Sequence, residues 1–122
     1  MASPSILIIE DDVPLLRLYS QVLTVYQYNV GQAETIDQAR NLLLTTHYDL
    51  LLADVQMGRE RSTDLIREMR NVLRESGTQI ILMSAEEKYR NLRDELKLDL
   101  FVVKPVAPSA LVNLVEQYLP AD

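Results

Sequence analysis

The sequence predicts a single α/β domain: an open, doubly wound sheet of five parallel strands with five helices. Apolar runs of strand length alternate along the chain with segments in which apolar residues recur at helical spacing. Such alternation implies parallel strands joined by right-handed helical crossovers. With the strands counted in chain order, the predicted order in the sheet is 2-1-3-4-5, which places the first and third strands side by side at the switch point.

The predicted strands are short, and all except the second are apolar runs. They cover Ile6–Ile9, Tyr28–Ala33, Tyr48–Asp54, Gln79–Ser84 and Leu100–Val103. Unbroken apolar runs of this kind are typical of strands that are buried on both faces by helices.

Three of the predicted helices carry clear start signals. Asp12 is a candidate N-cap with Pro14 in the first turn, and Thr35 with Gln38 forms a capping box. Pro108 fits the first turn of the last helix. The apolar stripes of these helices are Leu15, Leu16, Tyr19, Val22, Leu23 and Tyr26; Ile36, Ala39, Leu42 and Leu43; and Leu111, Leu114, Val115 and Tyr118.

The two remaining helices are marked less clearly. A polar loop over residues 58–61 leads into a helix that Ser62 or Thr63 caps and Gly77 ends. Its predicted apolar face is Leu65, Ile66, Met69, Val72 and Leu73. The segment Glu86–Leu98 predicts a mostly charged helix whose few apolar positions are Tyr89, Leu92 and Leu96.

Composition narrows the class of protein. The chain has 122 residues, 48% of them hydrophobic, which fits one globular domain over residues 1–122. The formal net charge is −6 with no basic block, so nucleic-acid binding is not expected. The absence of cysteine excludes disulfides and zinc–thiolate sites. No apolar run reaches the roughly 18 residues of a membrane span and no signal-peptide layout is present, so we expect a cytoplasmic protein without membrane contact.

Four of the predicted strands end in polar residues of different chemical kinds. Glu10 and Asp11 follow the first strand, Asp54 ends the third, Ser84 ends the fourth and Lys104 follows the fifth. Ligands of open α/β sheets bind at the carboxyl ends of the strands, so these side chains are expected to converge. Three carboxylates, a hydroxyl and an ammonium suit a divalent cation and a phosphoryl group.

The chemistry of such a cluster follows from its charges. Neighbouring carboxylates repel one another, and their pKa values rise unless cations neutralise them. A carboxylate can attack phosphorus to give an acyl phosphate. A metal ion, an ammonium and a hydroxyl can stabilise the charge that spreads onto the phosphoryl oxygens.

These residues resemble the receiver domains of two-component response regulators, which have the CheY-like, flavodoxin-like fold. Residues 6–12 resemble the acidic opening of that family, and residues 48–54 resemble its phosphoacceptor strand. Residues 82–85 resemble its hydroxyl strand, and residues 101–105 resemble its lysine strand. The four fragments stand in the family's order and span nearly the whole chain.

The resemblance implies roles in phosphoryl transfer for three residues and a role in switching for a fourth. Asp54 would accept a phosphoryl group from the phosphohistidine of a sensor histidine kinase or phosphotransfer protein. Lys104 would pair with that group, and Ser84 would donate a hydrogen bond to it. Phe101, at the aromatic switch position, would move with Ser84 and change a protein-interaction surface. The protein would catalyse only its own phosphorylation and dephosphorylation and would not otherwise be an enzyme.

The resemblance also implies a Mg²⁺ site, which Mn²⁺ can fill. Asp11 and Asp54 would bind the ion directly, and Glu10 would help mainly through water. The backbone carbonyl of Gln56 would be a further ligand. The downstream effector stays unidentified, and the family resemblance leaves room for a homodimer that forms on phosphorylation.

The chain departs from the family pattern at three places. The run 57–62 replaces the usual Met-Pro and glycine after the phosphoacceptor and brings basic residues beside the site. Ser84 stands where threonine is commoner, which retains the hydroxyl. Phe101 stands where tyrosine is frequent, so its ring cannot form a hydrogen bond when it is exposed.

Three other functions are compatible with the same fold class. A hydrolase with an aspartyl nucleophile usually needs a second Asp two residues after the first, where this chain has Gln56. A flavin carrier would need a Ser-, Thr- or Gly-rich phosphate loop where this chain has the acidic residues 10–12. A receiver-like binding module that works without phosphorylation stays open, because intact site residues do not prove their use.

Overall fold

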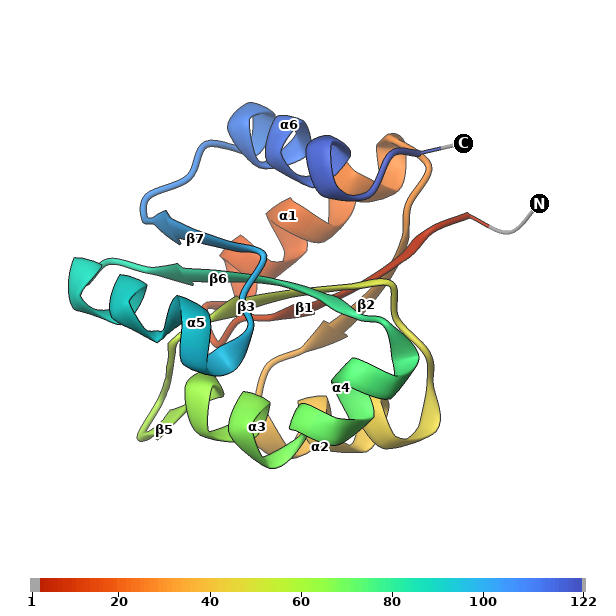
Figure 1. Ribbon diagram of the computed structural model, residues 1–122. Helices are drawn as coiled ribbons and strands as arrows, with labels where there is room; N and C mark the ends of the chain where they lie inside the picture. The colour runs from red at the N-terminus through yellow and green to blue at the C-terminus, as the bar shows by residue number, and fades with distance from the viewer. Residues whose placement is uncertain (1–2, 122) are drawn as a thin grey trace.

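A five-stranded parallel sheet with helices on both faces forms the centre of the structure, a computed structural model that describes residues 3–121 (Figure 1). The strand order is β2-β1-β3-β6-β7, which is the predicted order. The strands of this sheet are β1 (Ser5–Ile9), β2 (Asn29–Ala33), β3 (Leu50–Asp54), β6 (Gln79–Ser84) and β7 (Leu100–Val103). Their ends differ from the predicted ends by no more than two residues, which is the usual uncertainty of element boundaries.

The helices form two layers. On one face lie α1 (Val13–Val25) and α6 (Pro108–Tyr118). On the other face lie α2 (Ile36–Thr45), α3 (Ser62–Glu68) and α4 (Arg70–Ser76). The 3₁₀ helix η1 (Glu87–Leu92) and the single turn α5 (Arg93–Leu96) connect β6 to β7. No helix within residues 3–121 combines the length and apolar character that a bilayer crossing requires.

The predicted helix starts at Asp12 and Thr35 are confirmed. The Asp12 side chain accepts a hydrogen bond from the Leu15 amide, and the Thr35 hydroxyl accepts one from the Gln38 amide. Pro108 occupies the first turn of α6, as expected. Gly77 ends α4 in the left-handed conformation with φ 68°, which a glycine adopts without steric cost.

The segment predicted as one helix up to Gly77 is interrupted at Met69. Met69 has φ −95° and ψ 11°, so α3 and α4 are separate, and residues 3–121 contain six α-helices against the predicted five. The predicted cap at Ser62 or Thr63 was wrong, because Arg61 occupies the N-cap position and forms no side-chain cap bond. Val72, predicted to face the core, is 38% exposed.

The charged segment after β6 also differs from the prediction. It forms η1 followed by the four-residue α5 and not one regular helix. Tyr89, Leu96 and Leu98 are buried in the core cluster and Leu92 packs against that cluster, so the few predicted apolar positions do anchor the segment. With so few anchors, the backbone follows the underlying core and not helical propensity.

A short hairpin, not expected from the sequence, follows the strand that ends at Asp54. It consists of β4 (Gln56–Met57) and β5 (Glu60–Arg61), with Gly58 at φ 65° in the two-residue turn. A glycine at the first central position is typical of a type II′ turn. The hairpin therefore holds the loop after Asp54 in a defined shape.

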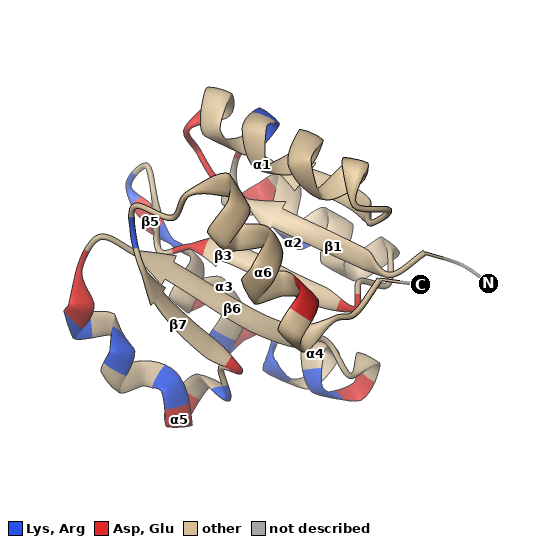
Figure 2. Cartoon of the chain, turned by 90° about the horizontal axis from the view of Figure 1, so that it is seen from above, with Lys and Arg blue, Asp and Glu red and all other residues tan. Residues whose placement is uncertain are grey.

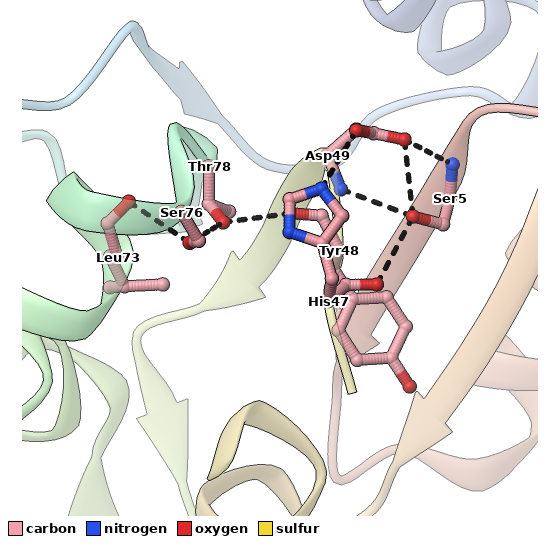
Figure 3. A network of polar contacts seen from close by, with 7 residues as sticks. All are labelled: Ser5, His47, Tyr48, Asp49, Leu73, Ser76 and Thr78. Atoms are coloured by element: carbon pink, nitrogen blue, oxygen red, sulfur yellow. Dashed lines mark hydrogen bonds and ion pairs between the residues drawn. The ribbon is translucent and has the colours of Figure 1, made fainter. Parts of the chain in front are cut away.

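The end of the sheet opposite Asp54 is tied together by polar contacts (Figure 3). Asp49, just before β3, accepts hydrogen bonds from the Ser5 amide at 2.8 Å and the Ser5 hydroxyl at 3.1 Å. The His47 ring lies 3.1 Å from the other Asp49 carboxylate oxygen. Thr78 donates to the Tyr48 carbonyl at 2.7 Å and links β3 to the start of β6. These contacts hold the three central strands in register.

The Asp49 contacts predict a pH-dependent contribution to stability. The hydrogen bond from the Ser5 amide, helped by His47, holds the pKa of Asp49 below its ordinary value of 3.8 although burial opposes this. A lowered pKa in the folded state adds stability above the ordinary pKa, and that stability is lost as the pH falls through the folded value. We expect the stability difference between the wild type and Asp49→Asn, measured by urea unfolding, to shrink below about pH 4. A stability difference between the two proteins that stays constant below about pH 4 would contradict a stabilising role for the ionised Asp49.

Candidate functional site

The polar residues at the strand ends meet at one edge of the sheet. Asp54 is the last residue of β3, and the parallel register pairs it with Met83, next to Ser84. Ser84 pairs with Val103, and the Lys104 amide donates to the Ser84 carbonyl at 2.8 Å. Glu10 comes directly after β1, whose last residue Ile9 pairs with Ala53. Register alone therefore brings these four polar side chains to one place.

Lys104 is the charge that joins the buried carboxylates. Its Nζ lies 2.7 Å from Glu10 Oε1 and 3.4 Å from Asp54 Oδ2. The Glu10 side chain is 1% exposed, and the Asp54 side chain is 11% exposed. Because two buried carboxylates share a single ammonium, the site retains a surplus of negative charge.

Burial is the main cause of the raised pKa values in this cluster. Desolvation raises the pKa of Glu10 and of Asp54, and their mutual repulsion adds to the rise at Glu10. Lys104 lowers both values without cancelling the effect of burial. Burial alone would lower the pKa of Lys104, but its hydrogen bond to Glu10 and the negative charge of Asp54 raise it. The folded site therefore favours the arrival of further positive charge.

A group of three acidic residues is arranged to hold a cation. Glu10, Asp11 and Asp54 each offer a carboxylate oxygen, and these atoms lie within 4.8 Å of one another. Asp11 is the exposed member, and its Oδ2 accepts a hydrogen bond from the Gly58 amide at 2.8 Å. Oxygen ligands from a small number of carboxylates are the set that Mg²⁺ prefers. The residues present fit that ion.

Ser84 and Gln56 flank the acidic group. The Ser84 side chain is 1% exposed, and its oxygen accepts a hydrogen bond from the Glu86 amide at 3.0 Å. Gln56 lies two residues after Asp54, at the start of the hairpin. Because the Ser62 amide bonds to the Val55 carbonyl, the alternating pattern of an antiparallel ladder leaves the Gln56 carbonyl outside the ladder.

The hairpin and η1 approach each other beside the site. The Gln56 side-chain amide donates to the Tyr89 hydroxyl at 3.2 Å. Phe101, in β7, is 4% exposed and belongs to the same buried cluster as Tyr89. The Arg90 guanidinium lies 5.1 Å from the centroid of the Phe101 ring, within the range of a cation–π contact. The ring is therefore enclosed by the core below and by Arg90 outside.

Comparison with known proteins identifies the family. The model for the response regulator receiver domain matches residues 6–116. The chain belongs to the response regulator receiver domain family. It is 33% identical over 116 residues to the transcriptional regulatory protein ResD of Bacillus subtilis and 29% identical over 113 residues to the nisin biosynthesis regulatory protein NisR of Lactococcus lactis. It covers 93% and 91% of its own length in these matches but only 47% and 48% of the relatives. The receiver domain thus spans about half of these relatives.

Solved receiver structures share the fold. The receiver domain of Methanospirillum hungatei superposes with a TM-score of 0.84 at 24% identity, covering 93% of this chain and 91% of that one. The response regulator TrrA of Thermotoga maritima, solved in complex with Mg²⁺ and beryllofluoride, has a TM-score of 0.81 at 25% identity. That match covers 95% of this chain and 99% of TrrA.

The sequence did not predict the contacts that the hairpin makes. The Gly58 amide reaches Asp11 and the Gln56 side chain reaches Tyr89, both through a turn that had been interpreted as a polar loop. The pair Gly58-Arg59 was the available signal, since a glycine followed by one residue can form a two-residue hairpin turn. The flanking residues lack the alternating apolar pattern that would have supported a hairpin.

Proposed function

We propose that this receiver domain accepts a phosphoryl group on Asp54 from the phosphohistidine of a histidine kinase or phosphotransfer protein. In this reaction an Asp54 carboxylate oxygen forms the new bond to phosphorus while the bond from phosphorus to the histidine nitrogen breaks. The electron pair of that bond stays on the imidazole, which takes a proton. The product is an acyl phosphate on Asp54.

The contact of Lys104 with both Glu10 and Asp54 is the observation that carries this proposal. An ammonium 3.4 Å from the Asp54 carboxylate lies where it can follow the negative charge of an attached phosphoryl group. Burial of Asp54 removes competing water from the nucleophile, and the Ser84 hydroxyl retains its proton for donation to a phosphoryl oxygen. Each of these residues lies at or directly after the end of a strand, so the sheet fixes its position.

Mg²⁺ completes the proposed site. Asp11 and Asp54 would hold the ion directly, Glu10 would help through water, and the Gln56 carbonyl would supply a further oxygen. When bound, the ion offsets the surplus negative charge and stabilises the phosphoryl oxygens. Asp11 is already oriented by the Gly58 amide, so one of its oxygens is held while the other is available.

Acetyl phosphate tests the proposal without a kinase. The wild-type chain, incubated with acetyl phosphate and Mg²⁺, is expected to gain the mass of one phosphoryl group in intact mass spectrometry. The gain should disappear when EDTA replaces Mg²⁺. An unchanged mass under both conditions would favour the alternative of a receiver-like module that works without phosphorylation.

Substitution of the acidic residues is expected to separate their roles. Asp11→Asn should weaken Mg²⁺ binding by roughly tenfold or more, because it removes a direct charged ligand, whereas Glu10→Gln should weaken it less. The measurement is an NMR titration with MgCl₂ that follows the amide of Asp54. Asp12→Asn, which keeps a side chain able to cap α1, is the matched control. An Asp11→Asn titration identical to that of the wild type would limit Asp11 to its contact with Gly58.

The output is proposed to run through Phe101. Movement of Ser84 toward a phosphoryl group would leave space that the Phe101 ring can fill, which would remodel the surface of η1, α5, β7 and α6. The ring is already buried under Arg90, and phenylalanine has no hydroxyl to hold it outside. The domain therefore favours the inward state before phosphorylation, and the switch is a shift between populations.

Beryllofluoride, a phosphoryl mimic, is expected to report this switch. Because the ring starts inside, we expect amide shifts near Phe101 and along residues 86–98 that are small beside those of the Asp54 pocket. Phe101→Tyr should enlarge the shifts near position 101 and along residues 86–98, because the added hydroxyl favours the exposed state of the ring before the mimic binds. The measurement is a pair of NMR spectra for each variant, with and without Mg²⁺ and beryllofluoride. A silent surface in both variants would contradict a role for Phe101.

The cellular setting is part of the same proposal. The receiver domain would work in the cytoplasm, where it meets its kinase, and would pass the signal to an effector protein or domain. Of the two relatives, ResD is named a transcriptional regulatory protein and NisR a nisin biosynthesis regulatory protein, which supports an effector that controls gene expression. A homodimer formed on phosphorylation is a further means of output through the same surface.

A further inference from the structure

A second pocket lies at the opposite end of the sheet from Asp54, between α4 and the end of α5. Its floor is formed by side chains of the buried core, each no more than 5% exposed: Ile66, Leu73, Ile80 and Leu96. Its volume is about 100 Å³. Small-molecule sites are usually about 300–1,000 Å³, so this pocket has room for little more than one aliphatic side chain.

The rim of this pocket is strongly basic although the chain carries a net charge of −6. Its charged members are Arg70, Arg74 and Lys97, and no acidic residue lines the pocket. Arg70 and Arg74 stand four residues apart and therefore share one face of α4. Figure 2 shows the Lys and Arg positions of α4 and of the segment around α5 in blue.

The three rim cations have no partner of their own within residues 3–121. The basic members of the ion pairs within these residues are Arg40, Arg67, Arg90, Lys88, Lys104 and His47, and none of them is a rim residue. The charge of Arg70 acts on Glu95, but the Glu95 carboxylate already pairs with Arg67. The rim therefore presents positive charge that the fold leaves unmatched.

Lys97 lies at the rim with a backbone conformation that is unfavourable for a residue with a side chain. It ends α5 in the left-handed conformation, with φ 56° and ψ 45°. Glycine is the usual residue at this position, and Gly77 fills the equivalent place at the end of α4. A side chain in this conformation costs roughly 1 kcal/mol, so the fold alone does not favour lysine over glycine.

We propose that this pocket binds an acidic peptide segment of a partner protein. One aliphatic side chain of the segment fills the apolar floor, and the flanking carboxylates pair with Arg70, Arg74 and Lys97. The size of the pocket selects a side chain and not a whole metabolite, and the unmatched charge selects an acidic partner. The inference goes beyond phosphorylation, because no lining residue belongs to the Asp54 site.

A blocked pentapeptide, Glu-Asp-Leu-Asp-Glu, is the probe for this site. Added to the ¹⁵N-labelled chain in low salt, it should shift the amides of Thr78, Leu96 and Lys97 in NMR spectra. Replacing its leucine by alanine should weaken binding roughly tenfold, because the apolar anchor is lost. Added salt should weaken binding further, since the rim pairs are exposed to solvent.

Variants of the chain make the test specific. Lys97→Gly should weaken peptide binding severalfold while the melting temperature stays equal or rises, which separates binding from folding. The double variant Arg70→Gln, Arg74→Gln should weaken binding further. Arg17→Gln removes an exposed cation of α1 that forms no ion pair within residues 3–121, so it is the matched control and should leave binding unchanged.

Four results would overturn the proposal. Absence of shifts at the pocket would show that the peptide does not bind there. Equal binding of the leucine and alanine peptides, or equal binding of citrate, would indicate a general anion site without an apolar anchor. Equal loss in the Arg17→Gln control would indicate attraction by overall charge. The Asp54→Asn variant should bind the peptide with the same affinity as the wild type. A negative result in the peptide titration would therefore leave the proposed phosphorylation of Asp54 unaffected.

Discussion

Replacing Asp54 by Asn is expected to abolish phosphorylation of this receiver domain completely. The amide that replaces the carboxylate is a poor nucleophile and cannot form an acyl phosphate. Incubation with acetyl phosphate and Mg²⁺ should leave the mass of the variant unchanged while the wild type gains one phosphoryl group. Asp12→Asn is the matched control, because it alters a neighbouring carboxylate that only caps α1. Full labelling of Asp54→Asn at another residue would exclude Asp54 as the acceptor.

The same variant is expected to be more stable than the wild type at neutral pH without Mg²⁺. Burial raises the pKa of Asp54 above its unfolded value. A carboxyl with a raised folded pKa binds more protons in the folded state, so the wild type loses stability as the pH rises through the two values. The neutral amide avoids that loss, and urea unfolding at pH 7 measures the gain. A less stable Asn variant would show that the ionised Asp54 stabilises the fold when no Mg²⁺ is added.

Replacing Lys104 by Met is expected to destabilise the fold by about 2–3 kcal/mol at neutral pH. The change leaves Glu10, which is 1% exposed, without its charged partner at 2.7 Å. We expect a loss smaller than for a fully enclosed pair, because the Lys104 side chain is 17% exposed. Urea unfolding without Mg²⁺ measures the difference.

A second substitution separates charge from packing in this prediction. Glu10→Gln in the Lys104→Met background should recover much of the lost stability, because the unpaired charge is removed. Lys88→Met, which alters a lysine that is 63% exposed, should change the stability by less than about 0.5 kcal/mol. If Glu10→Gln does not rescue Lys104→Met, the lysine contributes through its packing and not through its charge.

The sheet could be predicted from the sequence because four of its five strands are signalled twice. Each of these four is an apolar run that ends at a polar residue, whereas β2 is mixed in composition and lies between two predicted helices. Strand order then followed from the alternation of strands and helices, and the observed order is the predicted one. The meeting of Glu10, Asp54 and Lys104 is a consequence of that order, since parallel register aligns their strands. The roles of these residues stay predictions.

The parts that could not be predicted depend on contacts distant in the sequence. Met69 lies on the apolar stripe and carries no signal of a helix break. The segment after β6 has the charge pattern of a helix, yet only the burial of Tyr89 and Leu96 decides its path. The hairpin at Gly58 is fixed partly by the bond from its amide to Asp11, which is 47 residues away. No local pattern encodes that bond.

The location of the phosphoryl group tests the central claim most directly. The wild-type chain would be phosphorylated with phosphoramidate, whose phosphorus–nitrogen bond resembles that of phosphohistidine, in the presence of Mg²⁺. Borohydride then reduces an acyl phosphate to a stable alcohol, which converts a phosphorylated aspartate to homoserine, and peptide mass spectrometry locates the change. We expect homoserine at position 54 alone. Homoserine at Asp11 or Asp12, or none in a chain that binds Mg²⁺, would contradict the assignment of Asp54 as the phosphoacceptor.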